Sequence, residues 1–266
     1  MKLQILPAST GITWVKLGVK TFFKQPLALG GLFFMFMAAT SFLSIIPFAG
    51  TVMALAIIPA ATLGLMVAAL ETLRGKFPMP SVLLTAFKAD KHRLRGMLTL
   101  GVMYAIAFLA IVMLVNSVDG GTLEQLDLAD PEKARVVMDD PAFQNALMIG
   151  FALYGVLSIT FWHAPGLVYW YGLSPTKALF FSIVACVKNL GAYVMYGLTW
   201  MAILMGVSVF LAVVLGAFGM QALARPIMMA FALSMAAMLS TSVYFTFRDS
   251  FVHTEESPAE LHPPAA

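Results

Sequence analysis

The chain consists of long apolar stretches without formal charge, separated by short stretches that collect the acidic and basic residues. The first apolar stretch covers residues 27–70 and holds no Asp, Glu, Lys or Arg. About 20 apolar residues cross a hydrocarbon layer of about 30 Å, so this stretch is long enough for two crossings. Pro47 and Gly50 favour a turn near its middle. The pattern therefore predicts a helical hairpin that spans a membrane.

The same criterion, applied to the whole chain, predicts six transmembrane helices. Their expected positions are 27–46, 51–71, 96–117, 145–166, 190–215 and 226–247, within one domain that covers residues 1–249. An acidic loop at 119–141 separates the third and fourth helices. The tail at 250–266 contains Pro258, Pro263 and Pro264, and we expect it to be disordered. The predicted fold class is all-α, a polytopic membrane protein.

Composition supports this fold class and excludes others. The chain is 61% hydrophobic and only 11% charged, whereas soluble domains carry about 25% charged residues. A water-soluble surface could not be built from so few charges. The net charge is +3, and the bases form no patch with interleaved aromatic residues, so nucleic-acid binding has no support. The first long apolar run begins only after Lys24, which is not typical of a cleaved signal peptide.

The distribution of lysine and arginine predicts the orientation. Thirteen bases flank the spans on the side of the two chain ends, and three lie on the opposite side. Because cytoplasmic loops are enriched in Lys and Arg, we expect both termini in the cytoplasm. The acidic loop at 119–141 is then external. The expected location is the inner membrane of a bacterium.

Three segments on the basic side have the pattern of amphipathic interfacial helices, at 8–25, 81–92 and 175–188. In the first, Ile12, Val15, Val19, Phe22 and Phe23 share one face of a helical wheel, and lysines spaced four apart occupy another. Each segment precedes an odd-numbered span. This order suggests a threefold repeat of an interfacial helix followed by a hairpin, which we treat as a hypothesis.

The basic segments supply the leading functional hypothesis. A base near the membrane surface attracts anionic headgroups by about 1 kcal/mol. We expect a non-enzymatic role in membrane organisation, assembly or lipid interaction, with anionic membrane lipids as partners; a protein partner or a homo-oligomer stays open. The candidate headgroup ligands are Lys16, Lys20, Lys24, Lys88, Lys91, Arg93 and Arg95.

The alternative hypothesis is a transporter or channel for a neutral or apolar solute. Its candidate residues are Pro59, which can kink a helix and free a carbonyl, Asn116 and His163. Each has a structural explanation as well. Asn116 can hydrogen-bond at a helix end, and the ring of His163 can join Trp162 in an aromatic belt at the membrane interface.

Signatures of catalysis and cofactors are missing from the sequence. It contains no phosphate-binding Walker loop, no HExxH motif and no Ser-His-Asp order. The single cysteine, Cys186, lies among apolar residues and is expected to serve packing. We therefore expect no enzyme activity, no metal and no cofactor.

Two stretches near the N-terminus resemble a known family. Residues 2–8 (KLQILPA) and 23–29 (FKQPLAL), with Gly11, Trp14 and Gly18 between them, resemble the start of an uncharacterised family of proteobacterial polytopic inner-membrane proteins. More loosely, the later part of the chain is similar to the YciC-like six-helix membrane proteins. That similarity is carried by Ala164-Pro165, Ser174-Pro175, Ala178-Leu179, Ser182 and Asn189. Both resemblances imply a six-helix bacterial membrane protein without an established reaction.

Overall fold

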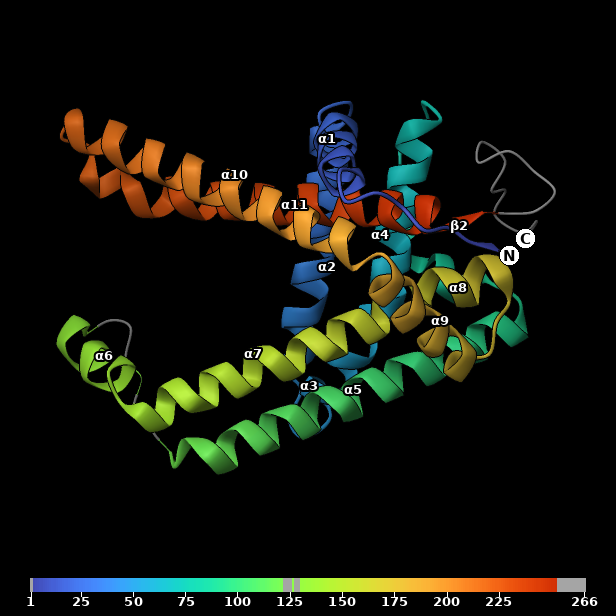
Figure 1. Cartoon of the computed structure of the whole chain (residues 1–266), viewed down its shortest axis with the longest axis horizontal. Coiled ribbons are helices and arrows are strands. Elements are labelled where there is room, and N and C mark those ends of the chain that lie inside the picture. Colours follow the sequence, from blue (N-terminus) through green and yellow to red (C-terminus); the bar gives the residue numbers. More distant parts are fainter. Residues whose placement is uncertain (1, 122–125, 127–129, 253–266) are drawn as a thin grey trace.

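The structure is a computed structural model that describes residues 2–121, 126 and 130–252. In these ranges the chain is almost entirely helical (Figure 1). The elements, in chain order, are β1 (Lys2–Leu3), α1 (Thr10–Phe22), α2 (Pro26–Ser44), α3 (Gly50–Ala56), α4 (Ile58–Leu73), the 3₁₀ helix η1 (Pro80–Lys88), α5 (Lys91–Asp119), α6 (Pro131–Met138), α7 (Pro141–Phe161), α8 (Ala164–Tyr171), α9 (Pro175–Lys188), α10 (Leu190–Ala217), the 3₁₀ turn η3 (Gln221–Leu223), α11 (Ala224–Ser250) and β2 (Phe251–Val252).

Six helical stretches in the described ranges are long and apolar enough to cross a membrane, which confirms the predicted all-α polytopic fold class. They are α2, α3 with α4, α5, α7 with α8, α10 and α11. The third span begins at Lys91, earlier than the predicted residue 96. The reason is local, because the Asp90 side chain accepts hydrogen bonds from the backbone N–H groups of His92 and Arg93 and caps the helix.

The prediction of a disordered tail at 250–266 is wrong for residues 250–252. Ser250 ends α11, and Phe251 and Val252 form β2, which pairs antiparallel with Lys2 and Leu3 of β1. Strand pairing with the N-terminus satisfies backbone groups that a free tail would leave to water. Residues 253–266 lie outside the described part of the chain. In the loop predicted at 119–141, the described residues include α6, Pro131–Met138.

The first interfacial segment forms α1, which packs against α10 and α11 rather than lying alone on the lipid. The apolar face was expected to rest on lipid, but Val15 and Phe22 are buried inside the protein, whereas Phe23 is exposed. Two glycines allow the close contact. A Cβ atom on Gly11 would lie 2.1 Å from the Ala192 carbonyl oxygen, and one on Gly18 would lie 2.3 Å from the Ser242 Cβ.

The second segment differs from its prediction, because residues 80–88 form the 3₁₀ helix η1 and not an α-helix. Pro80 at its start has no N–H to donate. The segment lies so close to α4 that a Cβ on Gly64 would be 2.7 Å from the Leu83 Cα. The third segment forms α9, Pro175–Lys188, over the predicted range.

The short segments α1, η1, α8 and α9 and the β1–β2 pair lie in the part of the molecule from which the long hairpins extend, which we call the hub (Figure 1). Here α1 and β2 pack against α11, η1 and α8 pack against α4, and α9 packs against α7 and α8. The large side chains that are fully buried lie mostly here and include Trp14, Leu167, Tyr244 and Phe247. From the hub, the hairpins α5/α7 and α10/α11 extend as two arms (Figure 1).

Candidate functional site

The predicted headgroup ligands lie on two surfaces of the hub. On α1, Lys16 and Lys20 are exposed on the side opposite Trp14 and Gly18, which are buried against the protein. Because residues at i and i+4 share a helix face, these two lysines are neighbours, and the exposed Lys24 follows in the turn after the helix ends. The structure thus places Lys16 and Lys20 on one exposed face of α1, with Lys24 just beyond its end.

The second surface comprises the end of η1 and the first turns of α5. Lys88, Lys91 and Arg95 are exposed there, and Arg93 is partly buried. The Arg93 guanidinium donates to the Asp90 carboxylate at 2.7 Å. The backbone N–H of Arg93, followed by its positive charge, holds the pKa of Asp90 below the ordinary value. Arg93 therefore takes part in the cap of α5 and is less available than the exposed bases to another partner.

His163 is sealed inside the hub at the break between α7 and α8, with no exposed surface. Its backbone N–H donates to the Ser182 hydroxyl at 3.0 Å, and its ring nitrogen Nε2 hydrogen-bonds to the Tyr193 hydroxyl. The rings of Phe247 and Phe251 lie against it. It contributes to packing between three spans rather than to an interfacial belt.

Asn116 and Pro59 lie in surroundings that differ from those of His163. Asn116 is exposed near the distal end of α5. Pro59 sits at the break between α3 and α4, where the helix is interrupted at Ile57, and it lines a cavity. Of the three residues proposed for a solute path, Pro59 lines one of the two cavities described below, whereas Asn116 and His163 line neither.

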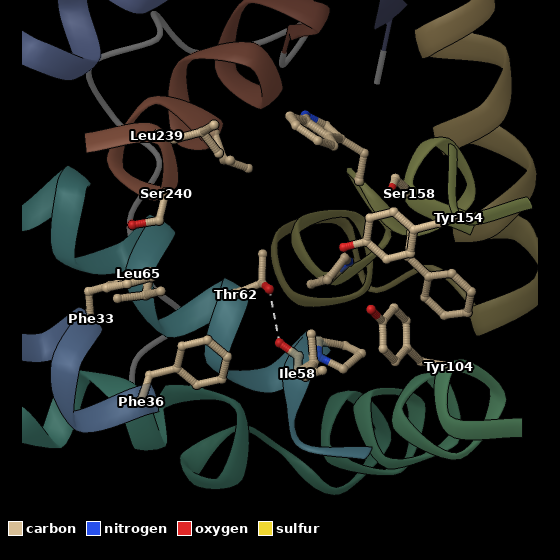
Figure 2. Close-up of a pocket in the computed structure, with 15 residues that line it drawn as sticks. Phe33, Phe36, Ile58, Thr62, Leu65, Tyr104, Tyr154, Ser158, Leu239 and Ser240 are labelled. Atoms are coloured by element: carbon tan, nitrogen blue, oxygen red, sulfur yellow. Dashed lines mark hydrogen bonds between the residues drawn. The ribbon is translucent and has the colours of Figure 1, made fainter. Parts of the chain in front are cut away.

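Two cavities lie between the arms. One, of about 320 Å³, lies between α2, α4, α5, α7 and α11 (Figure 2). The other, of about 350 Å³, lies between α7, α9, α10 and α11. Both are lined by Ser158, Trp162 and Leu239. We call the two together the inter-arm crevice.

Several hydroxyl groups line the first of these cavities, which Figure 2 shows. The phenols of Tyr104 and Tyr154 point into it and toward one another (Figure 2). The Ser158 hydroxyl lies one turn further along α7. By contrast, Thr62 and Ser240, which also line the cavity, donate to the backbone carbonyls of Ile58 and Ala237 within their own helices.

Sequence reasoning missed these hydroxyls, although one signal for them was available. Tyr154, Ser158 and Trp162 recur every four residues along a span and therefore share one face of α7. A polar face on a helix with no charge is typical of a surface that does not simply face lipid. The contribution of Tyr104 from another hairpin had no such signal, because it depends on how α5 packs beside α7.

The described ranges contain no cluster of side chains suited to bind a metal ion. In residues 2–121, 126 and 130–252, no group of three or more His, Cys, Asp or Glu side chains is placed to hold a metal ion. Cys186 is buried, and burial raises the pKa of its thiol to about 12. This thiol remains neutral at physiological pH.

Comparison with known proteins finds a relative that aligns with almost the whole chain. The chain is 36% identical over 264 residues to the "Probable inner membrane protein BTH_II0599" of Burkholderia thailandensis, and the alignment spans 98% of this chain and 98% of that protein. No family model matches the chain. No solved structure matches it either.

Proposed function

Because the chain belongs to the family of the probable inner membrane protein BTH_II0599 of Burkholderia thailandensis, we propose that it is a non-enzymatic inner-membrane protein that organises anionic lipid at one leaflet. Its location in the inner membrane as a multi-pass protein follows from this relationship and from the six apolar spans. The lipid-organising role is our proposal. The looser similarity to YciC-like proteins stays a prediction.

One observation carries the proposal, namely the exposed bases on the two hub surfaces. Within the part of the chain that the structure describes, Arg93 is the only one of the seven that forms an ion pair with a carboxylate. Unpaired lysines beside charge-free spans lie where lipid phosphates begin. Each would contribute about 1 kcal/mol to the attraction for anionic headgroups.

Lipid titration of the purified protein tests this role. In a non-ionic detergent, we expect native mass spectrometry to show more bound phosphatidylglycerol than phosphatidylcholine. The double variant K16E/K20E should weaken phosphatidylglycerol binding at least about 30-fold, because two contributions of about 1 kcal/mol are lost. Higher salt should weaken binding to the wild type as well.

A matched reversal provides the control. The variant R135E/R225E changes the same number of exposed charges on α6 and at the start of α11, away from the hub. It should bind phosphatidylglycerol as the wild type does. Equal binding by K16E/K20E and R135E/R225E would contradict the proposed role.

The proposed leaflet is the cytoplasmic one. The β1–β2 pair holds residues 2–3 beside 251–252, so these two ends of the described chain lie together. An even number of spans requires the same arrangement. The excess of bases on this side supports a cytoplasmic position for it under the positive-inside rule.

A second candidate function is passage of a neutral or apolar solute, which the inter-arm crevice and Pro59 favour. It predicts that such a solute raises the melting temperature of the purified protein. Pro59→Ala should reduce that increase, whereas Asn116→Ala and His163→Gln should alter it only through stability. A broad panel of solutes without any shift would argue against transport.

A further inference from the structure

The inter-arm crevice lies near the middle of the spans. Tyr104 is 13 residues from the first residue of α5, or roughly 20 Å along the helix. Ser240 lies ten residues before the end of α11, or roughly 15 Å from it. The hydrocarbon layer is about 30 Å thick, so a ligand here is surrounded by acyl chains and not by headgroups.

The lining carries no formal charge. Of the residues that border either cavity, none is Asp, Glu, Lys or Arg, and most are aromatic or aliphatic. An ion would therefore lose its hydration without gaining a partner. The occupant must be uncharged and largely hydrocarbon.

Three hydroxyls nevertheless face this apolar space. The phenols of Tyr104 and Tyr154 interact with each other, and both border the cavity together with the Ser158 hydroxyl (Figure 2). Away from water, an unmade hydrogen bond is costly. The arrangement offers donors to an acceptor oxygen on a bound molecule.

The crevice is open toward the bilayer. Tyr154 is 47% exposed although it lines the cavity, and α7 and α11, which form opposite walls, do not pack closely against each other. A ligand dissolved in the membrane can enter between the arms without passing through water. The volumes of about 320 and 350 Å³ lie within the range of roughly 300–1,000 Å³ that small-molecule sites occupy.

We infer that the inter-arm crevice binds a neutral lipid whose hydrocarbon chain fills the apolar walls and whose carbonyl or quinone oxygen accepts hydrogen bonds from Tyr104 and Tyr154. This inference goes beyond the proposed headgroup binding, since it concerns another surface and an uncharged class of lipid. Ester carbonyls and quinone oxygens share the required acceptor chemistry.

Equilibrium dialysis in detergent with three tritiated probes tests the inference. The probes are a decyl-chain benzoquinone, dioctanoylglycerol and dodecane, the last of which has no oxygen. We expect saturable binding of at least one of the two oxygen-bearing probes and weaker binding of dodecane. The probe that binds more tightly identifies the quinone or the ester as the source of the acceptor.

The variant Y104F/Y154F removes only the two hydroxyls and keeps the aromatic rings that pack at this site. It should bind the preferred probe about tenfold more weakly, because two hydrogen bonds are lost. Ser158→Ala should have a smaller effect in the same direction. Its control, Ser234→Ala, removes a hydroxyl that donates to the Ala230 carbonyl on the same type of span and should change nothing.

Headgroup binding at the hub and neutral-lipid binding in the crevice can be refuted independently of each other. Y104F/Y154F should bind phosphatidylglycerol as the wild type does, and K16E/K20E should bind the neutral probe as the wild type does. Unsaturable uptake of both oxygen-bearing probes, equal affinity of Y104F/Y154F and wild type, or dodecane binding as tight as theirs would each overturn the neutral-lipid site.

Discussion

At the scale of single residues, two glycines determine how closely α1 approaches the last hairpin. Gly11 faces the backbone of Ala192 and Tyr196 on α10, and Gly18 faces Ser242 on α11. Between them, the fully buried Trp14 donates its indole N–H to the Asp249 carboxylate at 2.9 Å. Small residues that allow backbones to meet are the usual basis of helix association where lipid removes the hydrophobic driving force.

Replacing either glycine by alanine should destabilise the protein. The new methyl groups of Gly11→Ala and Gly18→Ala would fall 2.1 and 2.3 Å from protein atoms, and such overpacking costs about 1–3 kcal/mol. Thermal unfolding in detergent measures the loss. Gly197→Ala is the control, since its Cβ would have nothing within 4 Å, and a similar decrease there would contradict the explanation.

Asp90 should make stability depend on pH on the acidic side. Its carboxylate accepts the backbone N–H groups of Arg93 and His92 and pairs with the Arg93 guanidinium, which lowers its pKa in the folded protein. A lowered folded pKa means that the stabilisation is present above the unfolded value of about 4 and is lost as the pH falls through the folded value. We expect Asp90→Ala to melt at a lower temperature than wild type at pH 7.

Comparing wild type with Asp90→Ala at lower pH tests whether the ionised carboxylate causes the difference in melting temperature. The difference in melting temperature between wild type and Asp90→Ala should narrow below about pH 4, as the carboxylate is protonated. Asp90→Asn keeps a capping side chain and should fall between the two at pH 7. A difference that does not change from pH 7 to pH 3 would exclude the carboxylate as its origin.

At the scale of elements, the short hub segments pack away from the hairpins that follow them in the chain. α1 packs mainly on α10 and α11, η1 on α4, and α9 on α7 and α8. Each segment thus joins its own hairpin to another one. The hypothesis of a threefold repeat remains a prediction, but this packing gives its three units a common way of contacting one another.

The sequence predicts the elements better than their contacts. Charge-free runs locate the spans because the cost of a charge in hydrocarbon is large and local. The 3₁₀ form of η1 and the packing of α1 were not predictable from periodicity, since both depend on glycines, Gly64 and Gly18, that accept a neighbour distant in sequence. For the same reason, Tyr104 gave no sign that it would join Tyr154.

Asn189 fastens the N-terminal segment to the start of α10, and its loss should release that segment. The side chain is 1% exposed; it accepts the Leu6 N–H at 2.8 Å and donates to the Gln4 carbonyl at 3.0 Å. Asn189→Ala leaves both backbone groups without this partner, at a cost of about 1–3 kcal/mol for a buried group. We expect faster proteolysis within the first ten residues.

The control for Asn189 is the exposed Asn145 on α7. Asn145→Ala should leave the N-terminal cleavage rate and the melting temperature as in wild type. If Asn189→Ala were cleaved no faster than Asn145→Ala, the β1–β2 pair and not Asn189 would protect the N-terminal segment from proteolysis.

At the scale of the whole molecule, burial is concentrated at the hub and in α4, whereas α10 and the distal parts of the arms are largely exposed. In water such exposed apolar helices would aggregate. In a bilayer they face acyl chains, so the same surface needs no further covering. The inter-arm crevice follows from this division, because the two arms diverge from the hub (Figure 1) and leave space between them.

The arrangement of hub and arms predicts which residues an impermeant reagent reaches. Lys16 at the hub and Val136 on α6 are both exposed and lie at opposite ends of the spans. The native Cys186 does not compete, because it is buried and its thiol has a pKa of about 12. In intact spheroplasts, we expect a membrane-impermeant maleimide to label Val136→Cys, and to label Lys16→Cys only after permeabilisation. Thirteen of the sixteen bases lie on the side of Lys16. Labelling of Lys16→Cys from outside would therefore mean that most of the positive charge faces away from the cytoplasm, against the positive-inside rule. It would also reverse the leaflet to which we assign anionic lipid.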